Sequence, residues 1–502
     1  MSASSSPASS PIQGAAKSAK ACVCCQIKKK GCDKMLPSCG RCLQASHDCL
    51  HEEDLLNASG SVRAALRGRQ IRSPIPPSLF EAINSAKDID SFALTTVMDI
   101  LDDRRGVERA VASYFGGVNT WFTIIEQANF EKQLAETLQK PSAEICVLAL
   151  CMSMIARPPD PNPVSGVGDA SYHTTKALLG LVQSNVPMST ELLQAELLVA
   201  MYEFSHGNPQ QAYLTLGRCV QMTRAFEWHD KRFWGGGRHP RELKLCSILW
   251  WAIVYVDCLL NAGYEDQKLP MHTTSLGLDF VIPFPEAFDQ YLSGNLLLHF
   301  DAQGKLVRDA HISQIGGMIL PEANSAWYLS SVLQHLSNPS ALSTADLSTA
   351  ITQHTTDLVS GTWINVDRNA AVGTNFIALM KLNQPSLFSI GSLPVSDLNN
   401  TRPVDTIRNL VTLIQQAAED AAKSEARLSA GAMAPCWAFA MYYASLLLIS
   451  HGDGVLQDTD WLLKVEHFKT LLKIFSKRWR IAEIYFESVN IALNDRLTRY
   501  SM

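Results

Sequence analysis

Six cysteines near the amino terminus recur at spacings that suit metal binding. Two residues separate Cys22 from Cys25, six separate Cys25 from Cys32, and after six more the same unit begins again. A Cys-x2-Cys pair lets two thiolates reach one tetrahedral Zn2+ ion, and the third cysteine of each unit can return to its ion. The pattern predicts a zinc module with the ligands Cys22, Cys25, Cys32, Cys39, Cys42 and Cys49.

The number of thiolates sets the number of metal ions. Two tetrahedral Zn2+ ions need about eight ligand positions, which six thiolates fill only when two sulfurs bridge both ions. The cluster would carry a formal charge of −2, and its six thiolates would repel one another without the metal. Metal binding and folding of the module are therefore expected to be one event. Cys24 lies off this register and is expected to be spare.

The segment resembles the fungal Zn2Cys6 binuclear-cluster DNA-binding domain. Besides the cysteine spacing, the residues that match this family are Ala21, Lys28, Lys29, Asp33 and Pro37. Gln26 and Gly31 stand where the family usually has arginine and lysine. The resemblance implies two bound Zn2+ ions, Cys22 and Cys39 as bridging ligands, and recognition of CGG-like triplets in double-stranded DNA. The spacing alone leaves open a structural zinc knuckle that binds no nucleic acid.

Basic side chains are expected to make the DNA contacts. Residues 1–50 hold seven basic and two acidic residues, a net charge of +5, whereas the whole chain carries −5, so the remainder carries −10. A basic head on an acidic body is typical of a polyanion-binding module joined to a domain of another kind. In the related domains, the positions of Lys28 and Lys29 enter the major groove on a short helix, here residues 26–30, where lysine can bind guanine edges. The full set of expected DNA-binding residues is Lys28, Lys29 and Lys30, with Lys17, Lys20, Lys34 and Arg41 as phosphate contacts.

Composition divides the chain into four parts. Residues 1–20 are small and polar and are expected to be a disordered tail, residues 21–50 form the zinc module, and residues 51–78 form a linker with Pro-rich Ser73–Ser78. The heptad pattern in that linker is poor, because Gly60 interrupts it, so homodimerisation through a coiled coil is left open. Residues 79–502 are expected to be a large all-α domain.

Helical periodicity carries the prediction for the large domain. Its clearest feature is an αα-hairpin, with helices over 190–205 and 210–226 joined by a Gly-Asn-Pro turn. The other predicted helices cover 144–156, 241–262, 402–428 and 435–449, and one ends at Gly116–Gly117 before an aromatic turn. The order of the hairpin, the Leu-Trp-Trp helix at 249–257 and the loop at 280–285 resembles the fungal-specific transcription factor domain. The fold class expected is mainly α, a Zn2Cys6 module plus this regulatory domain.

Other classes of protein find little support in the sequence. Residues 428–450 lack charges, but their strongly apolar part is shorter than the roughly 20 residues that a membrane span needs, so no membrane contact is expected. The six cysteines beyond residue 50 lie in apolar helical surroundings, which favours inert core thiols. No HExxH or GxSxG motif is present, and six cysteine ligands would leave zinc without an open position, so no enzyme is expected.

The function predicted is that of a nuclear, sequence-specific transcription regulator of RNA polymerase II genes. Its partners would be double-stranded DNA and the transcription machinery or co-regulators, and no residue set points to a small-molecule effector. Proteins of similar layout often control a biosynthetic gene cluster, commonly of secondary metabolism. The alternative is a zinc-containing co-regulator or scaffold that binds protein rather than DNA, which the departures at Gln26 and Gly31 allow.

Overall fold

The computed structural model separates the chain into two compact units, Met1–Ser73 and Pro74–Met502, each described by itself. The structure describes residues 21, 25, 30–35, 39–44, 88–157, 170–235, 237–263, 269–278, 280–285, 287–288, 321–338, 343–359, 369–390, 402–424 and 434–501. The predicted tail, residues 1–20, and the predicted linker, residues 51–78, lie outside these ranges. In the small unit, helix α2 covers Gly40–Gln44.

Helices make up the described elements of the large unit, which confirms the predicted fold class. The first part of the unit contains α5 (Ile89–Leu101), α6 (Arg104–Phe115), the 3-10 turn η1 (Val118–Thr120), α7 (Gln127–Thr137), α8 (Ala143–Ala156), α9 (Ala170–Asn185), α10 (Thr190–Ser205), α11 (Pro209–Ala225), α12 (Lys231–Gly235) and α13 (Pro240–Gly263). After the 3-10 turn η3 (Thr274–Leu276) follow α15 (Pro321–Ser337), α16 (Thr344–Val359), α17 (Asn369–Ile390), α18 (Arg402–Ser424), α19 (Cys436–His451), α20 (Trp461–Phe475) and α21 (Arg480–Ser501).

The predicted αα-hairpin is present as α10 and α11, and local signals mark the start of α10 and the turn between the two helices. Ser189 caps the start of α10, because its hydroxyl accepts a hydrogen bond from the Leu192 amide at 3.3 Å. Gly207 adopts the left-handed conformation, with φ of +77°, directly after the helix ends. Pro209 then occupies the first turn of α11, where a missing amide hydrogen does no harm.

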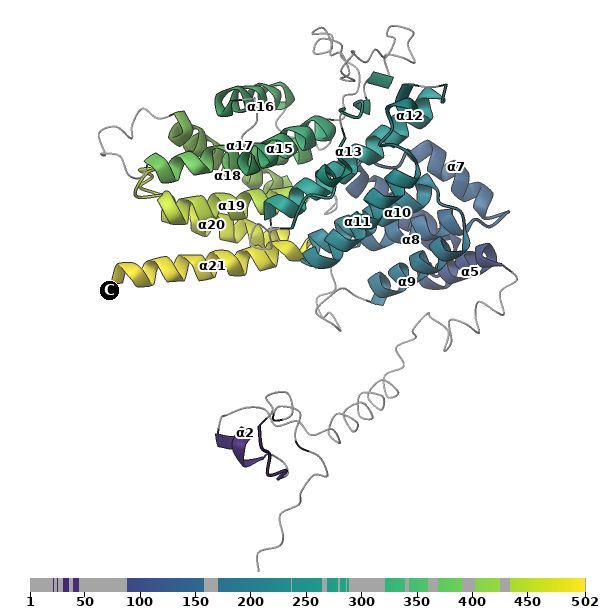
Figure 1. Ribbon diagram of the computed structural model, residues 1–502, viewed down its shortest axis with the longest axis horizontal. Coiled ribbons are helices and arrows are strands. Elements are labelled where there is room, and N and C mark those ends of the chain that lie inside the picture. Colours follow the sequence, from purple (N-terminus) through teal and green to yellow (C-terminus); the bar gives the residue numbers. More distant parts are fainter. Residues whose placement is uncertain are drawn as a thin grey trace, which may run out of the picture. The chain divides into compact units, whose positions relative to one another are not determined.

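The core is centred on helices with almost no exposed face. Every residue of α10 from Leu192 to Ser205 is buried, and α8 is buried without interruption from Ile145 to Ile155. Helix α13 crosses the large unit between the earlier helices, drawn in blue, and the later ones, drawn in green and yellow (Figure 1). The buried aromatic residues of α10 and α13 belong to the same continuous core.

Helix α13 is also the one described helix long and apolar enough to span a membrane. In the structure, 83% of its most apolar window is buried among other helices, which is the position of a core helix in a globular protein. The apolar stretch singled out at residues 428–450 contributes the shorter helix α19. One helix of this kind is weak evidence for a membrane protein, and its burial accounts for its composition.

The end of the chain packs back on the beginning of the large unit. The buried Arg478, between α20 and α21, donates hydrogen bonds to the carbonyl oxygens of Ile155 and Arg157 at the end of α8. On α21, Ile484 lies against the α10–α11 turn, where a Cβ on Gly207 would come within 2.1 Å of Ile484 Cδ1. Elements more than three hundred residues apart thus form one core with the hairpin.

Candidate metal centre and a buried polar layer

Three of the predicted metal ligands come together in the small unit. The sulfurs of Cys25, Cys32 and Cys39 all lie within 4.8 Å of one another. The Cys25 and Cys39 sulfurs are 3.8 Å apart. Tetrahedral zinc with Zn–S bonds of about 2.3 Å places two thiolate sulfurs roughly 3.8 Å apart. The donor type and spacing therefore fit a Zn2+ ion shared by these three thiolates.

Short backbone turns hold these cysteines in place. The Lys30 amide donates to the Cys25 carbonyl at 2.9 Å, which closes a turn after the first ligand pair. The Leu43 amide donates to the Cys39 carbonyl at 3.0 Å, which starts α2 at the fourth cysteine. Helix α2 also buries Cys42, whose amide lies 3.4 Å from the Cys39 sulfur. An N–H directed at a thiolate stabilises its negative charge, so this contact favours the thiolate form of Cys39, which is the form that binds a metal ion.

Several predicted site residues cannot be placed. Cys22 and Cys49, the remaining two ligands, lie outside the described residues, as do Lys17, Lys20, Lys28 and Lys29. Lys30 and Arg41 are exposed, as phosphate or base contacts must be. Lys34 has a left-handed backbone with φ of +61° and turns the chain between Cys32 and Cys39. The number of metal ions and the DNA contacts therefore remain predictions.

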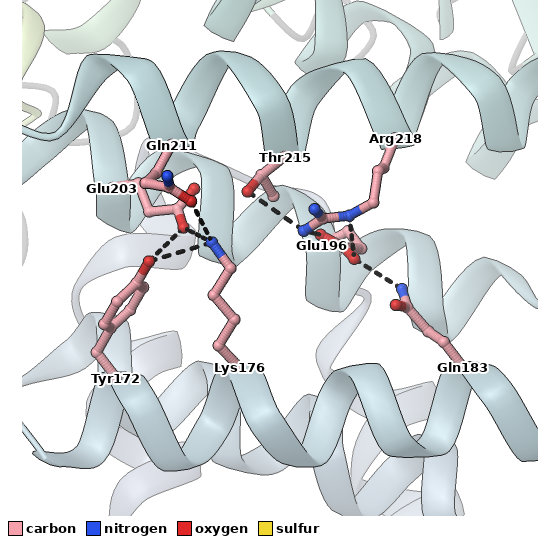
Figure 2. Close-up of polar contacts among 8 residues, drawn as sticks. All are labelled: Tyr172, Lys176, Gln183, Glu196, Glu203, Gln211, Thr215 and Arg218. Carbon is pink, nitrogen blue, oxygen red and sulfur yellow. Dashed lines mark hydrogen bonds and ion pairs between the residues drawn. The ribbon is translucent and has the colours of Figure 1, made fainter.

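The large unit contains a polar layer that the sequence analysis did not identify. Helix α10 carries two buried carboxylates, Glu196 and Glu203, that face α9 on one side and α11 on the other (Figure 2). Glu196 receives a two-pronged contact from Arg218 on α11, with both N–O distances at 3.1 Å. Gln183 on α9 donates to the same carboxylate at 2.7 Å. The Glu196 carboxylate thus links α10 to both α9 and α11.

Glu203 forms the second half of the layer. It pairs with Lys176 of α9, and Tyr172 donates its hydroxyl to the same oxygen at 2.6 Å. The Lys176 ammonium also reaches the amide oxygen of Gln211 on α11 at 3.2 Å. Burial and the neighbouring Glu203 raise the pKa of Tyr172, so its hydroxyl remains a donor. The sequence does contain a signal for this layer, because Glu196 and Glu203 are two carboxylates seven residues apart in an otherwise apolar helix.

The polar layer has the properties of a packing device rather than a reaction centre. Each carboxylate already has a cation and at least one further donor, which compensates the buried charge, although one oxygen of Glu203, Oε2, is buried without a hydrogen-bond partner. Elsewhere in the unit, burial raises the pKa of Cys146, Cys246 and Cys436 to about 12, so they stay protonated at neutral pH. These thiols behave as the inert core residues expected.

A cavity in the large unit is too small for most ligands. Its volume is about 40 Å³, and aromatic side chains of Trp121, Trp251 and Tyr255 line it together with Glu322. Pockets that take drug-sized molecules are usually about 300 to 1,000 Å³. This cavity has room for a water molecule or two, and it does not point to an effector.

Comparison with known proteins places this arrangement in a family. The model of the fungal specific transcription factor domain matches residues 111–293, which run from α6 beyond α13. Transcription factor BOA15 of Botryotinia fuckeliana is 31% identical over 137 residues, covering 27% of this chain and 73% of that protein. The pigment biosynthesis transcriptional activator pigB of Monascus ruber is 26% identical over 273 residues, covering 46% of this chain and 48% of that protein. No solved structure matches the chain.

The large helical unit and the cysteine cluster ahead of it define a transcription regulator with a regulatory domain of all-α fold. The chain belongs to the family of fungal transcription factors that carry the fungal-specific transcription factor domain. Members of this family are transcription factors and not enzymes, which agrees with the prediction that the protein has no catalytic activity. Because the alignment spans about half of the second relative, the activity of the whole protein is a matter for proposal.

Proposed function

We propose that this protein is a zinc-dependent, sequence-specific DNA-binding regulator of RNA polymerase II genes. Two Zn2+ ions held by Cys22, Cys25, Cys32, Cys39, Cys42 and Cys49 would fold the small unit. The basic residues of that unit would bind CGG-like triplets, and the helical unit would contact co-regulators. The observation that carries the proposal is the approach of three thiol sulfurs to within 4.8 Å in a chain of this family.

Charge supports DNA as the partner. The metal cluster itself is anionic, so attraction to DNA must come from the lysines and arginine around it. Lys30 and Arg41 are exposed on the small unit, where they can reach a phosphate backbone. Nuclear localisation follows from this role, and the lysine run at 28–30 also suits an import signal.

A binding assay with the full-length chain tests the proposal. Labelled duplexes carrying one CGG triplet, or two triplets in direct or inverted orientation, are compared with scrambled duplexes at fixed salt. Each base pair changed within the triplet is expected to weaken binding by roughly 5- to 150-fold. A zinc chelator should abolish the specific complex, and added Zn2+ should restore it. Specific binding that persists after complete zinc removal would refute the proposal.

Variants separate base contacts from phosphate contacts. Lys28→Ala and Lys29→Ala should reduce discrimination between CGG and scrambled duplexes, because these side chains are the expected base readers. Lys17→Ala should instead weaken binding to all duplexes and lower the slope of log affinity against log salt by about 1. Lys140→Ala, an exposed change in the helical unit, is the matched control and should alter neither. Equal binding to triplet and scrambled DNA would favour a co-regulator that binds protein.

The target genes are proposed from the second relative, whose name describes an activator of pigment biosynthesis. We infer that this protein regulates a biosynthetic gene cluster for a secondary metabolite. Mapping its bound sites on chromatin, with transcript levels after deletion of the gene, tests this. Bound sites scattered over unrelated housekeeping genes, with no cluster responding to the deletion, would count against it.

A further inference from the structure

One carboxylate joins the two halves of the metal centre. Asp33 directly follows the ligand Cys32, and Gly40 directly follows the ligand Cys39. The Gly40 amide donates to both oxygens of the Asp33 carboxylate, at 3.0 Å to Oδ2 and 3.1 Å to Oδ1. The Met35 amide lies 3.4 Å from Oδ1. The Asp33 side chain thus connects the residue that follows Cys32 to the residue that follows Cys39.

The backbone is shaped to allow this close approach. Lys34 takes the left-handed conformation and turns the chain back immediately after Asp33. Gly40 has no side chain, and a Cβ added there would lie 2.7 Å from Asp33 Oδ2, inside normal contact distance. A side chain at position 40 would therefore require the Asp33 carboxylate to shift. Glycine here is therefore matched to the aspartate seven residues earlier.

The position of Asp33 depends on its hydrogen bonds and not on attraction between its charge and the thiolate cluster. The thiolate cluster is already anionic, so another negative charge beside it is repelled rather than attracted. A carboxylate retained at such a position must be stabilised by its donors, and backbone amides to a charged acceptor make comparatively strong hydrogen bonds. The contact fixes the chain at both ends of the loop between Cys32 and Cys39.

We propose that Asp33 is a positioning residue of the metal centre, which holds Cys32 and Cys39 at the separation that one Zn2+ ion requires. The inference rests on the proposed zinc function and adds a residue that is not itself a ligand. Partners outside the ligand set typically change metal affinity by about 10- to 100-fold when removed. Because Asp33 is exposed, we expect the lower end, about tenfold.

Metal titrations of the full-length chain test the role of Asp33. Zinc affinity is measured by competition with a chromophoric chelator, and Co2+ absorption reports the geometry of the thiolate site. Asp33→Ala should bind the same number of ions about tenfold more weakly, with a changed Co2+ spectrum. Asp33→Asn keeps an acceptor oxygen and should recover most of the affinity and the spectrum. Leu43→Ala, an exposed change on α2, the helix that begins with Gly40, is the control.

Gly40→Ala tests the contact from its other side. The new methyl group should displace the carboxylate and weaken zinc binding about as much as Asp33→Ala does. The double variant should be no weaker than either single variant, because both remove the same contact.

The outcomes distinguish this inference from the function on which it rests. If the unmodified chain binds no zinc, the zinc module itself is refuted. If it binds zinc and Asp33→Ala does so with unchanged affinity, the positioning role is overturned. Loss of a bound ion in Asp33→Ala would make Asp33 a ligand, and fully additive effects in the double variant would show that the two residues act separately; either result contradicts the proposal.

Discussion

Removing the ammonium of Lys176 tests whether the polar layer holds the three helices together. The side chain of Glu203 is 0% exposed and that of Lys176 is 26% exposed, so the pair is buried on the carboxylate side. Lys176→Met keeps the aliphatic stem and removes the charge, which leaves Glu203 with Tyr172 as its remaining donor among the described contacts. Breaking a buried ion pair from one side usually costs about 3 to 5 kcal/mol.

The expected loss lies at the low end of that range. Water can approach through the exposed quarter of Lys176, and the Tyr172 hydroxyl still stabilises the carboxylate at 2.6 Å. We therefore expect Lys176→Met to lower the free energy of unfolding by about 3 kcal/mol. The double variant with Glu203→Gln leaves no buried charge at this pair and should recover at least half of the loss, about 1.5 kcal/mol or more, because the two changes are coupled.

Urea unfolding of the full-length chain measures these differences. All ten tryptophans lie between residues 121 and 479, so tryptophan fluorescence reports the helical unit and not the small unit. Lys132→Met is the matched control, since Lys132 and its partner Glu136 are 76% and 68% exposed, and it should cost less than about 1 kcal/mol. A Lys176→Met variant as stable as Lys132→Met would refute the reasoning that Glu203 is a buried charge in need of a cation.

Three further predictions concern the same helical core and use the same unfolding assay. Burial lowers the pKa of His206 to about 3, so the unfolded state, titrating near 6.5, takes up the proton first and stability falls as the pH drops below 6.5. His206→Gln should remove about 1 to 2 kcal/mol of the loss between pH 6.5 and pH 5, and an unchanged pH profile would contradict this. Gly207→Ala should destabilise by more than about 1 kcal/mol, because φ is +77° and a Cβ would strike Ile484, whereas Gly180→Ala, with open space around it inside α9, should be neutral or stabilising. Arg478→Met should cost about 2 to 4 kcal/mol, because it leaves the carbonyls at the end of α8 without their donors, and a loss below about 1 kcal/mol would show that water replaces them.

The sequence predicts best those features that neighbouring residues determine. The predicted α10 range, 190–205, is confirmed, and residues next to its ends account for both of them: Ser189 caps its start and Gly207 follows its end. Cysteine spacing likewise identifies Cys25, Cys32 and Cys39, which the structure brings together. In each case the signal is chemical and lies within a few residues of the feature.

Features that depend on packing between distant segments could not be predicted in the same way. Glu203 shows only that a carboxylate sits in an apolar helix, and its partner Lys176 lies 27 residues earlier on α9. Arg478 contacts a carbonyl 323 residues away, and no local pattern marks that pairing. Asp33 was recognisable as a residue that matches the family, but its contact with Gly40 depends on the turn at Lys34.

The two units depend on different sources of stability, and this difference bears on regulation. Among the described residues of the small unit, only Cys25, Cys39 and Cys42 are buried, so under the proposed zinc function metal ligation would hold these residues in place of an apolar core. The large unit buries a continuous apolar core in which α8 and α10 are almost fully enclosed and α13 is buried over most of its length, and this core needs no metal. If the small unit binds zinc and DNA as proposed, zinc availability would switch DNA binding while the helical unit stays folded. In the same proposal, co-regulators would contact the helical unit, and their signal would not depend on zinc because the apolar core of that unit forms without it.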